Sequence, residues 1–311
     1  MRKALVFGAC QEMGNNLCRT LINNDWDVIG IIRDDSAHVP ILSQLTLAEM
    51  NSDDLDFLYQ VAKDVDTVFV HLPESAAARK ELIFSIEHII SLSEQLKLRL
   101  VITTNKYDVQ QPWFPSLAVW RKNKPITVRL PKRLKNRLRQ ASFNGAKVLV
   151  ICCGHSLSCA LHHGYLGMLI KETQQKVIIQ SPSNQRLCHY WTFLPDLADN
   201  IAHLLSHEQC EQPDLNIVYY PGHKASINDI ARCLALSSGK PVSIIQLSWT
   251  ILEFIAFFSP LFRRFLKTRE LWQHGGKPPA YSIPLHAPSS FIHTPLELAL
   301  QRSWRSVSNY A

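Results

Sequence analysis

The chain has 311 residues and a formal net charge of +7, and 46% of its residues are hydrophobic. This composition supplies a large core and excludes a wholly disordered protein. The length fits one large domain, or a domain with a smaller unit appended. No stretch approaches the roughly 20 apolar residues that a membrane-spanning helix needs. An apolar strand pattern starts almost at once and leaves no room for a signal peptide, so we expect a cytoplasmic location.

Short apolar runs alternate with helical patterns along the chain. The apolar runs predict strands at 4–7, 27–32, 45–50, 66–71, 98–103, 147–152, 216–219 and 242–246. Apolar positions three and four residues apart predict helices at 15–24, 54–62, 76–96, 132–142, 193–205, 226–237 and 294–304. Four prolines mark 110–131 as a long loop. Continuous Val, Ile and Leu runs are typical of parallel strands buried on both faces, so this order predicts an α/β fold.

A very apolar segment at 248–258 precedes three basic residues, Arg263, Arg264 and Lys267. With about ten apolar residues it is too short to span a membrane. One interpretation is that it rests on a membrane surface. The interpretation that we favour is packing within a C-terminal lobe or at the interface of a homodimer.

The positive charge is concentrated in one part of the chain. Between Asp108 and Glu172 there are eleven Lys and Arg and no acidic residue, and 121–139 is the densest stretch. Such a segment indicates either a site for phosphate-rich ligands or nucleic acid, or a solvated helix and loop. Aromatic side chains do not follow Trp120 within it, which weakens the case for single-stranded nucleic acid. We therefore expect no nucleic-acid partner.

The eight cysteines include no C-x-x-C pair and no Cys/His spacing of the zinc type. Cys152 and Cys153 follow an apolar run and are expected in the core or a turn. The pair His162–His163 has no third ligand at a characteristic spacing. We predict neither a disulfide scaffold nor a metal site.

The first strand runs into a glycine turn. Gly8 and Gly14 lie six residues apart in GACQEMG (8–14), and an amphipathic helix and a second strand follow. A tight turn needs a residue without Cβ, and the following helix N-terminus offers free N–H groups to a pyrophosphate. This unit of about 30 residues is typical of dinucleotide binding, so we assign Cys10, Gln11 and Met13 to the cofactor site with the two glycines. Gln11 stands where the middle glycine of the usual triplet would be.

The end of the second strand bears on which dinucleotide binds. Arg33 directly follows the apolar run and could pair with a 2′-phosphate, whereas Asp34 could accept a hydrogen bond from a ribose hydroxyl. We favour NADP, and NAD stays open. Glu49 and Met50 are expected to flank the adenine.

Taken together, five segments resemble the extended and atypical short-chain dehydrogenase/reductase (SDR) superfamily, near its nucleoside-diphosphate-sugar epimerase and NmrA-like branches. The segments are GACQEMG (8–14), DVDTVFVHLPES (64–75), LVITTN (100–105), YWTFLPDLADNIAHLL (190–205) and FIHTPLELAL (291–300). The resemblance implies a Rossmann-type doubly wound parallel sheet with a small C-terminal α/β lobe. It implies an NAD(P)-binding core at 1–155, and further Rossmann elements with a substrate-side lobe at 156–311. It places His71, Leu72 and Thr103 against the cofactor.

The catalytic set of the family is incomplete here. Active members use a Ser or Thr and, about 25 residues later, a Tyr-x-x-x-Lys pair that moves the substrate proton. Thr103 and Thr104 fit the first role, and Lys132 matches the lysine, but the tyrosine has no match. Tyr107 or His155 could move the proton instead.

These features predict NAD(P)-dependent oxidoreductase or epimerase-like activity on a small or nucleotide-linked substrate, with Thr104 polarising the substrate oxygen. The missing Tyr-x-x-x-Lys pair supports an alternative from another class. In that alternative the protein binds NAD(P) without turnover and acts as a redox sensor or regulator.

Overall fold

The computed structural model describes residues 2–32, 42, 44–49, 54–72, 76–104, 132–157, 165–206, 215–258, 266, 269–274 and 291–308. Several sequence predictions fall outside these described residues. They concern Arg33, Asp34, Met50, Tyr107, the loop at 110–131, the pair His162–His163, and the basic residues Arg263, Arg264 and Lys267.

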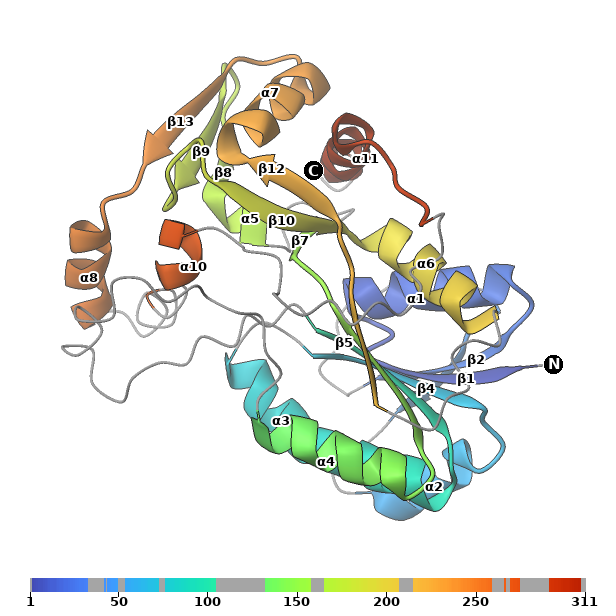
Figure 1. Cartoon of the computed structure of the whole chain (residues 1–311). Helices are drawn as coiled ribbons and strands as arrows, with labels where there is room; N and C mark the ends of the chain where they lie inside the picture. Colours follow the sequence, from blue (N-terminus) through green and yellow to red (C-terminus); the bar gives the residue numbers. More distant parts are fainter. Residues whose placement is uncertain are drawn as a thin grey trace.

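The centre of the molecule is a seven-stranded parallel sheet, as the apolar runs predicted (Figure 1). Its strands are β1 (Lys3–Phe7), β2 (Asp27–Ile32), β3 (Thr46–Glu49), β4 (Thr67–Leu72), β5 (Arg99–Thr104), β6 (Lys147–Cys152) and β11 (Asn216–Tyr219). The spatial order is β11-β6-β5-β4-β1-β2-β3. The chain therefore reverses direction across the sheet between β1 and β4, and in open α/β sheets such a switch point is where ligands bind.

Helices cover both faces of this sheet (Figure 1). One face carries α2 (Leu55–Ala62), α3 (Ala76–Gln95) and α4 (Lys132–Phe143); the other carries α1 (Glu12–Asn23) and α6 (Leu194–Ser206). The pleat of a strand sends successive side chains to opposite faces. Leu5 accordingly packs in one buried cluster with Ile89 of α3, and its neighbour Val6 packs in the other with Leu17 of α1. This is the doubly wound α/β fold that the sequence predicted.

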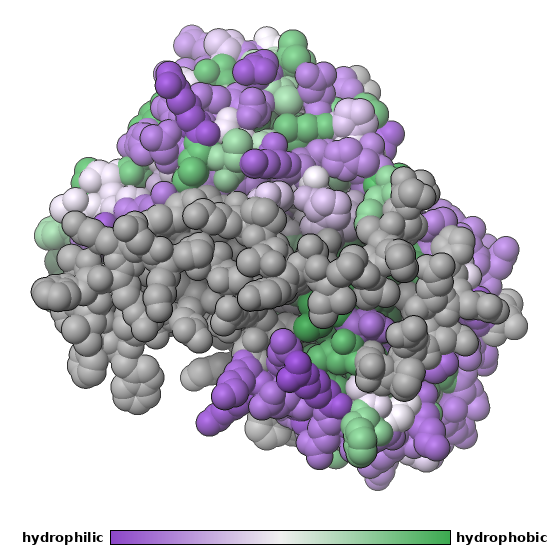
Figure 2. Space-filling model, viewed as in Figure 1, coloured by the Kyte–Doolittle hydropathy of each residue, from purple (hydrophilic) through white to green (hydrophobic). Residues whose placement is uncertain are grey.

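An ion pair joins α3 and α4. The Arg137 guanidinium donates to both carboxylate oxygens of Glu94, at 2.8 and 2.5 Å, and its Nε lies 3.3 Å from Glu87. Hydrogen bonding from Arg137 is the main cause that lowers the pKa of Glu94. The exposed side chains of α4 include Lys132, Arg133 and Arg139, and the lower part of the face in Figure 2, where α3 and α4 lie, is largely hydrophilic. This part of the basic segment is a solvated helix.

The second half of the chain builds a smaller lobe from two three-stranded sheets. Its strands are β7 (His155–Leu157), β8 (Ile170–Glu172), β9 (Val177–Ser181), β10 (Cys188–Phe193), β12 (His223–Ser226) and β13 (Val242–Gln246). Its helices are α5 (Tyr165–Leu169), α7 (Ile227–Ser238), α8 (Trp249–Phe258), α10 (Arg269–His274) and α11 (Leu296–Ser308). β13, α7 and α11 were predicted, whereas β7, β8, β9, β10, β12, α5 and α10 were not.

Helix α8 occupies the apolar segment at 248–258. Leu252 and Ala256 are buried, whereas Ile251, Phe254, Phe257 and Phe258 are exposed. Within the described ranges, no helix is long and apolar enough to cross a membrane. The packing of these exposed side chains within the lobe or at a homodimer interface stays a prediction.

Candidate functional site

The turn after β1 closes as the glycine spacing predicted. Gly8 has φ +71°, a conformation that residues with a Cβ rarely adopt, and its carbonyl accepts a 2.8 Å hydrogen bond from the Gln11 N–H. A Cβ on Gly14 would lie only 2.1 Å from the Gly8 carbonyl oxygen. The first turn of α1 therefore rests directly on the backbone of Gly8. This contact aims the helix N-terminus at the carboxyl ends of the strands, beside the switch point.

Gln11 is the N-cap residue of α1 and is exposed. Its side chain lies over Gly8, with Cδ and Oε1 each 3.2 Å from where a Gly8 Cβ would be. It makes no side-chain capping hydrogen bond. Cys10 is partly exposed in the same turn, and Met13 is buried beneath it. Since the Gln11 amide is not needed to cap the helix, it is available to a ligand at the helix N-terminus.

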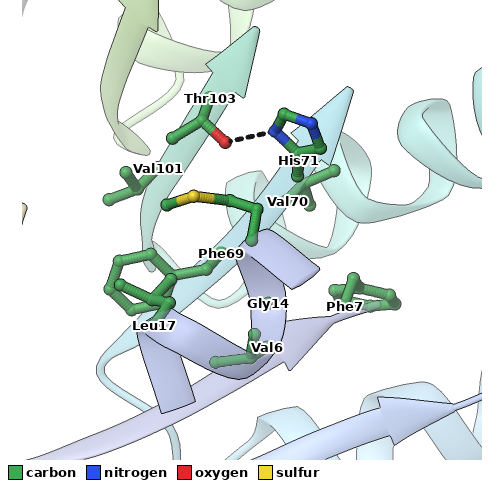
Figure 3. Close-up of a pocket in the computed structure, with 10 residues that line it drawn as sticks. Val6, Phe7, Gly14, Leu17, Phe69, Val70, His71, Val101 and Thr103 are labelled. Carbon is green, nitrogen blue, oxygen red and sulfur yellow. Dashed lines mark hydrogen bonds between the residues drawn. The ribbon is translucent and has the colours of Figure 1, made fainter. Parts of the chain in front are cut away.

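A small pocket lies under this helix end, between α1 and the strands β1, β4 and β5 (Figure 3). It is lined by Val6, Phe7, Met13, Gly14, Leu17, Phe69, Val70, His71, Val101 and Thr103. Most of the lining is apolar, and His71 and Thr103 provide the polar side chains. Their Nδ1 and Oγ1 atoms lie 2.9 Å apart, at adjacent ends of β4 and β5 (dashed line in Figure 3).

Burial lowers the pKa of His71 to about 4, because desolvation disfavours the charged imidazolium. The ring is therefore neutral at physiological pH, and one nitrogen can donate while the other accepts. The hydrogen bond with Thr103 fixes the ring at the strand ends. Leu72, the next residue, is buried at the end of β4.

The neighbouring threonines lie on opposite faces of β5. Val101 packs on the α1 side of the sheet and Ile102 on the side of α3 and α4. The strand alternation continues, so Thr103 lies on the pocket side and Thr104 on the other. Thr104 is buried, and its carbonyl accepts a 2.8 Å hydrogen bond from the Cys153 N–H. Of the two, Thr103 therefore lies where a ligand under α1 would meet a hydroxyl.

The other predicted residues do not gather around this pocket. Glu49 is exposed at the end of β3, where it pairs in register with Ile32 at the end of β2. That places it at the expected edge of the sheet. Lys132 is exposed at the first residue of α4.

His155 lies in the core of the lobe, among aromatic rings. It stacks on Trp272 at 5.1 Å between centroids with 12° between planes, and the Trp191 ring is 5.2 Å away. Desolvation, followed by the proximity of His189, lowers the pKa of His155 to about 3. The neighbouring His189 is also buried, and its Nε2 lies 2.8 Å from Ser183 Oγ. These imidazoles act as neutral packing groups in the folded lobe.

A second polar cluster lies at the start of α6, and sequence reasoning did not single it out. Both carboxylate oxygens of Asp196 accept hydrogen bonds from Thr294, one from its N–H at 2.6 Å and one from its hydroxyl at 2.7 Å. The side-chain amide of Asn200, one turn later, makes two hydrogen bonds of 2.8 Å with the backbone of Ile292: its N–H donates to the Ile292 carbonyl, and its Oδ1 accepts from the Ile292 N–H. We call residues 291–295 the strap, because these bonds hold the segment before α11 against α6 (Figure 1).

Over most or all of its length the fold resembles several solved structures. It is similar to MoeE5 in complex with UDP-glucose and NAD, with a TM-score of 0.68, 14% sequence identity and 99% of both chains covered. It is also similar to leucoanthocyanidin reductase with NADPH from Vitis vinifera, with a TM-score of 0.61 and 11% identity over 98% of this chain and 99% of that one.

A third match is NmrA, a negative transcriptional regulator, with a TM-score of 0.59 and 11% identity over 79% of this chain and 75% of that one. The sequence matches no protein-family model and no curated protein. At these identities the likeness shows the fold, which is the one that the five sequence segments predicted.

Proposed function

We propose that the protein binds NADP, with NAD as the alternative, across the glycine turn and the carboxyl ends of β1, β4 and β5. The observation that carries this proposal is the contact between Gly14 and Gly8, where a Cβ would meet a carbonyl oxygen at 2.1 Å. This close approach opens the N-terminus of α1 to a pyrophosphate, which its N–H groups and helix dipole favour. The solved structures of the same fold with NAD or NADPH support it.

Within this site we propose NAD(P)-dependent oxidoreductase or epimerase-like chemistry on a small or nucleotide-linked substrate. The cofactor, when bound, would supply hydride exchange. Thr103 would donate its hydroxyl hydrogen bond to the substrate oxygen, and His71, 2.9 Å away, would orient that hydroxyl. This differs from the sequence expectation, in which Thr104 had the polarising role. Tyr107, which lies outside the described residues, remains the candidate for proton transfer.

The binding proposal is tested by titrating the pure protein with NADPH, NADP, NADH and NAD in a calorimeter. The sharpest variant is Gln11→Glu, which keeps the side-chain shape and adds a negative charge at the helix N-terminus. A like charge about 4 Å from a phosphate costs about 1–4 kcal/mol, so we expect binding about tenfold weaker or more. A carboxylate at this end of a helix does not destabilise the fold. Gln180→Glu on β9 makes the same change at an exposed site in the lobe.

Weaker binding in Gln11→Glu alone, with unchanged melting, supports the proposed site. Equal affinities in the wild type and both variants would place the nucleotide elsewhere. Binding of none of the four nucleotides would mean that the fold serves as a scaffold without cofactor.

The catalytic part is tested separately, with NADPH consumption over a panel of nucleotide sugars and small carbonyl compounds. Thr103→Val removes the hydroxyl and keeps the shape, so turnover should fall by about 100-fold or more. Thr104→Val tests the other threonine. Thr67→Val is the control, because Thr67 is buried at the start of β4 and its hydroxyl has no hydrogen-bond partner among the described residues. Full turnover in Thr103→Val would contradict our assignment.

A second candidate function is a regulator or redox sensor that binds NAD(P) without consuming it. The supporting observation is that the described candidates for proton transfer do not converge, since His155 is packed in the lobe and Lys132 is exposed on α4. The likeness to NmrA is in line with it. A sensor should bind the oxidised and reduced cofactor with unequal affinity and turn over neither with any substrate tested.

A further inference from the structure

We propose that Asp196, His223 and His293 form a binding site for a divalent transition-metal ion of the zinc type. Asp196 lies in the first turn of α6, His223 is the first residue of β12, and His293 belongs to the strap. One carboxylate oxygen and one ring nitrogen from each histidine lie within 4.8 Å of one another. The three side chains come from segments far apart in the sequence, which is why no ligand spacing revealed them.

The types of ligand fit this class of ion. Imidazole nitrogen together with carboxylate oxygen suits Zn²⁺, Co²⁺ and Ni²⁺, and two His with one carboxylate leave a fourth position for water. With metal–ligand bonds of about 2.0–2.1 Å, the ligand atoms of a tetrahedral site lie roughly 3.3 Å apart. The three atoms must therefore approach each other by about 1.5 Å at most. His293 is exposed, so its side chain is free of the core and can turn toward the other two.

The two imidazoles already face each other without satisfying their polar atoms. Their centroids lie 4.3 Å apart with 35° between the rings, and His223 is only 7% exposed. Within the part of the chain that the structure describes, neither ring has a hydrogen-bond partner. A metal ion would be a partner that both rings and the carboxylate share.

The Asp196 carboxylate is held in a fixed orientation, as a metal ligand needs to be. Asp196 is buried, and its two hydrogen bonds from Thr294 fix its orientation. Each carboxylate oxygen has about two lone-pair sites, so each can accept these bonds and still face a metal. Hydrogen bonds of this kind to metal-bound carboxylates are a regular feature of metal sites.

An ion in this place would tie the strap, α6 and β12 together through one centre. A ligand that binds only the folded state stabilises it in proportion to the logarithm of its concentration over the dissociation constant. The expected effect is therefore a higher melting temperature in the presence of metal. This inference does not depend on nucleotide binding.

The test uses the tag-free full chain, stripped of metal with a chelator that is then removed. Zn²⁺ is titrated by calorimetry, and Co²⁺ is followed through its visible absorption. We expect one tight site in the wild type and binding at least about tenfold weaker in His293→Ala. Because His293 is exposed, this variant is expected to fold. His203→Ala, on the last turn of α6, removes another histidine and should keep the site.

Melting temperatures with and without Zn²⁺ provide a second readout. Metal should raise the melting temperature of the wild type and of His203→Ala, and raise that of His293→Ala much less, because its binding is weaker. Equal zinc affinity in the wild type and His293→Ala, or no binding to the wild type, would overturn the proposal. Loss of binding in His203→Ala as well would also overturn it, since the ion would then be held by scattered surface histidines.

Discussion

The turn between β1 and α1 and the interior of the lobe fill buried space in different ways. At the turn between β1 and α1, two glycines without side chains let backbones meet: Gly14 rests on Gly8, and two polar side chains, His71 and Thr103, line the pocket below. In the lobe, large rings fill the space: Trp191, Trp272, His155 and His189 pack within about 6.4 Å of one another. The first region leaves backbone and a few polar side chains together at the strand ends, whereas rings fill the second. His155 and His189 in the second region are therefore packing residues.

The largest expected effect comes from breaking the aromatic cluster. Trp191 is fully buried, and its indole N–H donates a 3.1 Å hydrogen bond to the Ala225 carbonyl. Trp191→Ala should lower the free energy of unfolding by about 3–5 kcal/mol, measured by urea denaturation. Phe254→Ala, on the exposed face of α8, should change it by less than about 0.5 kcal/mol. If the lobe tolerated loss of Trp191, the cluster would not be a structural core.

Gly14→Ala should affect the turn between β1 and α1. The added Cβ forces the first turn of α1 away from Gly8, and we expect a cost of about 1–3 kcal/mol in stability. We also expect nucleotide binding about tenfold weaker or more, since displaced N–H groups lose charge-assisted hydrogen bonds. Gly239→Ala is the matched control: Gly239 has φ +67° at the end of α7 and open space around it, so strain costs about 1–2 kcal/mol there. A loss of nucleotide affinity in both variants would point to general destabilisation.

Glu94→Gln tests the ion pair between α3 and α4 through the pH dependence of stability. At neutral pH we expect a loss of about 1–2 kcal/mol, since a hydrogen bond to a charged group is removed. The pKa of Glu94 is lowered in the folded state, so its stabilisation is complete above the unfolded value of about 4.3. It is lost as the pH falls further, through the folded value. The difference in unfolding free energy between the wild type and Glu94→Gln should therefore shrink below about pH 4, and a constant difference would contradict this origin.

The smallest effect is expected at the cap of α7. Ser226 and Asp229 form a capping box, in which the Ser226 hydroxyl accepts from the Asp229 N–H and the Asp229 carboxylate accepts from the Ser226 N–H. Ser226→Ala should cost about 1 kcal/mol, measured by thermal denaturation, and leave nucleotide affinity unchanged. Leu236→Ala, at an exposed position near the other end of α7, is the control, and an equal loss there would show that the cap itself is not responsible.

The difference between the regions also explains what the sequence could predict. The central strands β1, β4, β5 and β6 are buried on both faces, so they read as apolar runs, whereas the edge strand β3 is exposed or half-buried. Apart from β13, the strands of the lobe are short or carry polar residues inward, as in His155–Leu157 and Ile170–Glu172, and no periodicity marks them. β10 runs into α6 without a turn, so its last residue, Phe193, was predicted as the start of the helix.

The same holds for the site. Gly8 follows β1 and Gly14 lies in the first turn of α1, whereas His71 and Thr103 lie near the ends of β4 and β5, so their positions could be inferred from strand ends and spacing. His155 follows β6 closely, but β7 carries its ring into the lobe, and Trp272 on α10 was not foreseen as its partner. Asp196, His223 and His293 meet only because the strap returns to α6 and β12. Contacts of this kind between distant segments cannot be inferred from local sequence patterns.

The strap has a consequence for the order of folding. Its hydrogen bonds join residues 92 to 98 positions apart, and loops of that length close late because their entropy must be lost before the contact is made. Until then Asp196 and Asn200 lack their partners in the strap, so we expect α6 to dock firmly only after α7 and α11 have brought the strap into place. Contacts that form after the transition state chiefly slow unfolding. We therefore expect the strap chiefly to slow unfolding, with little effect on the rate of folding.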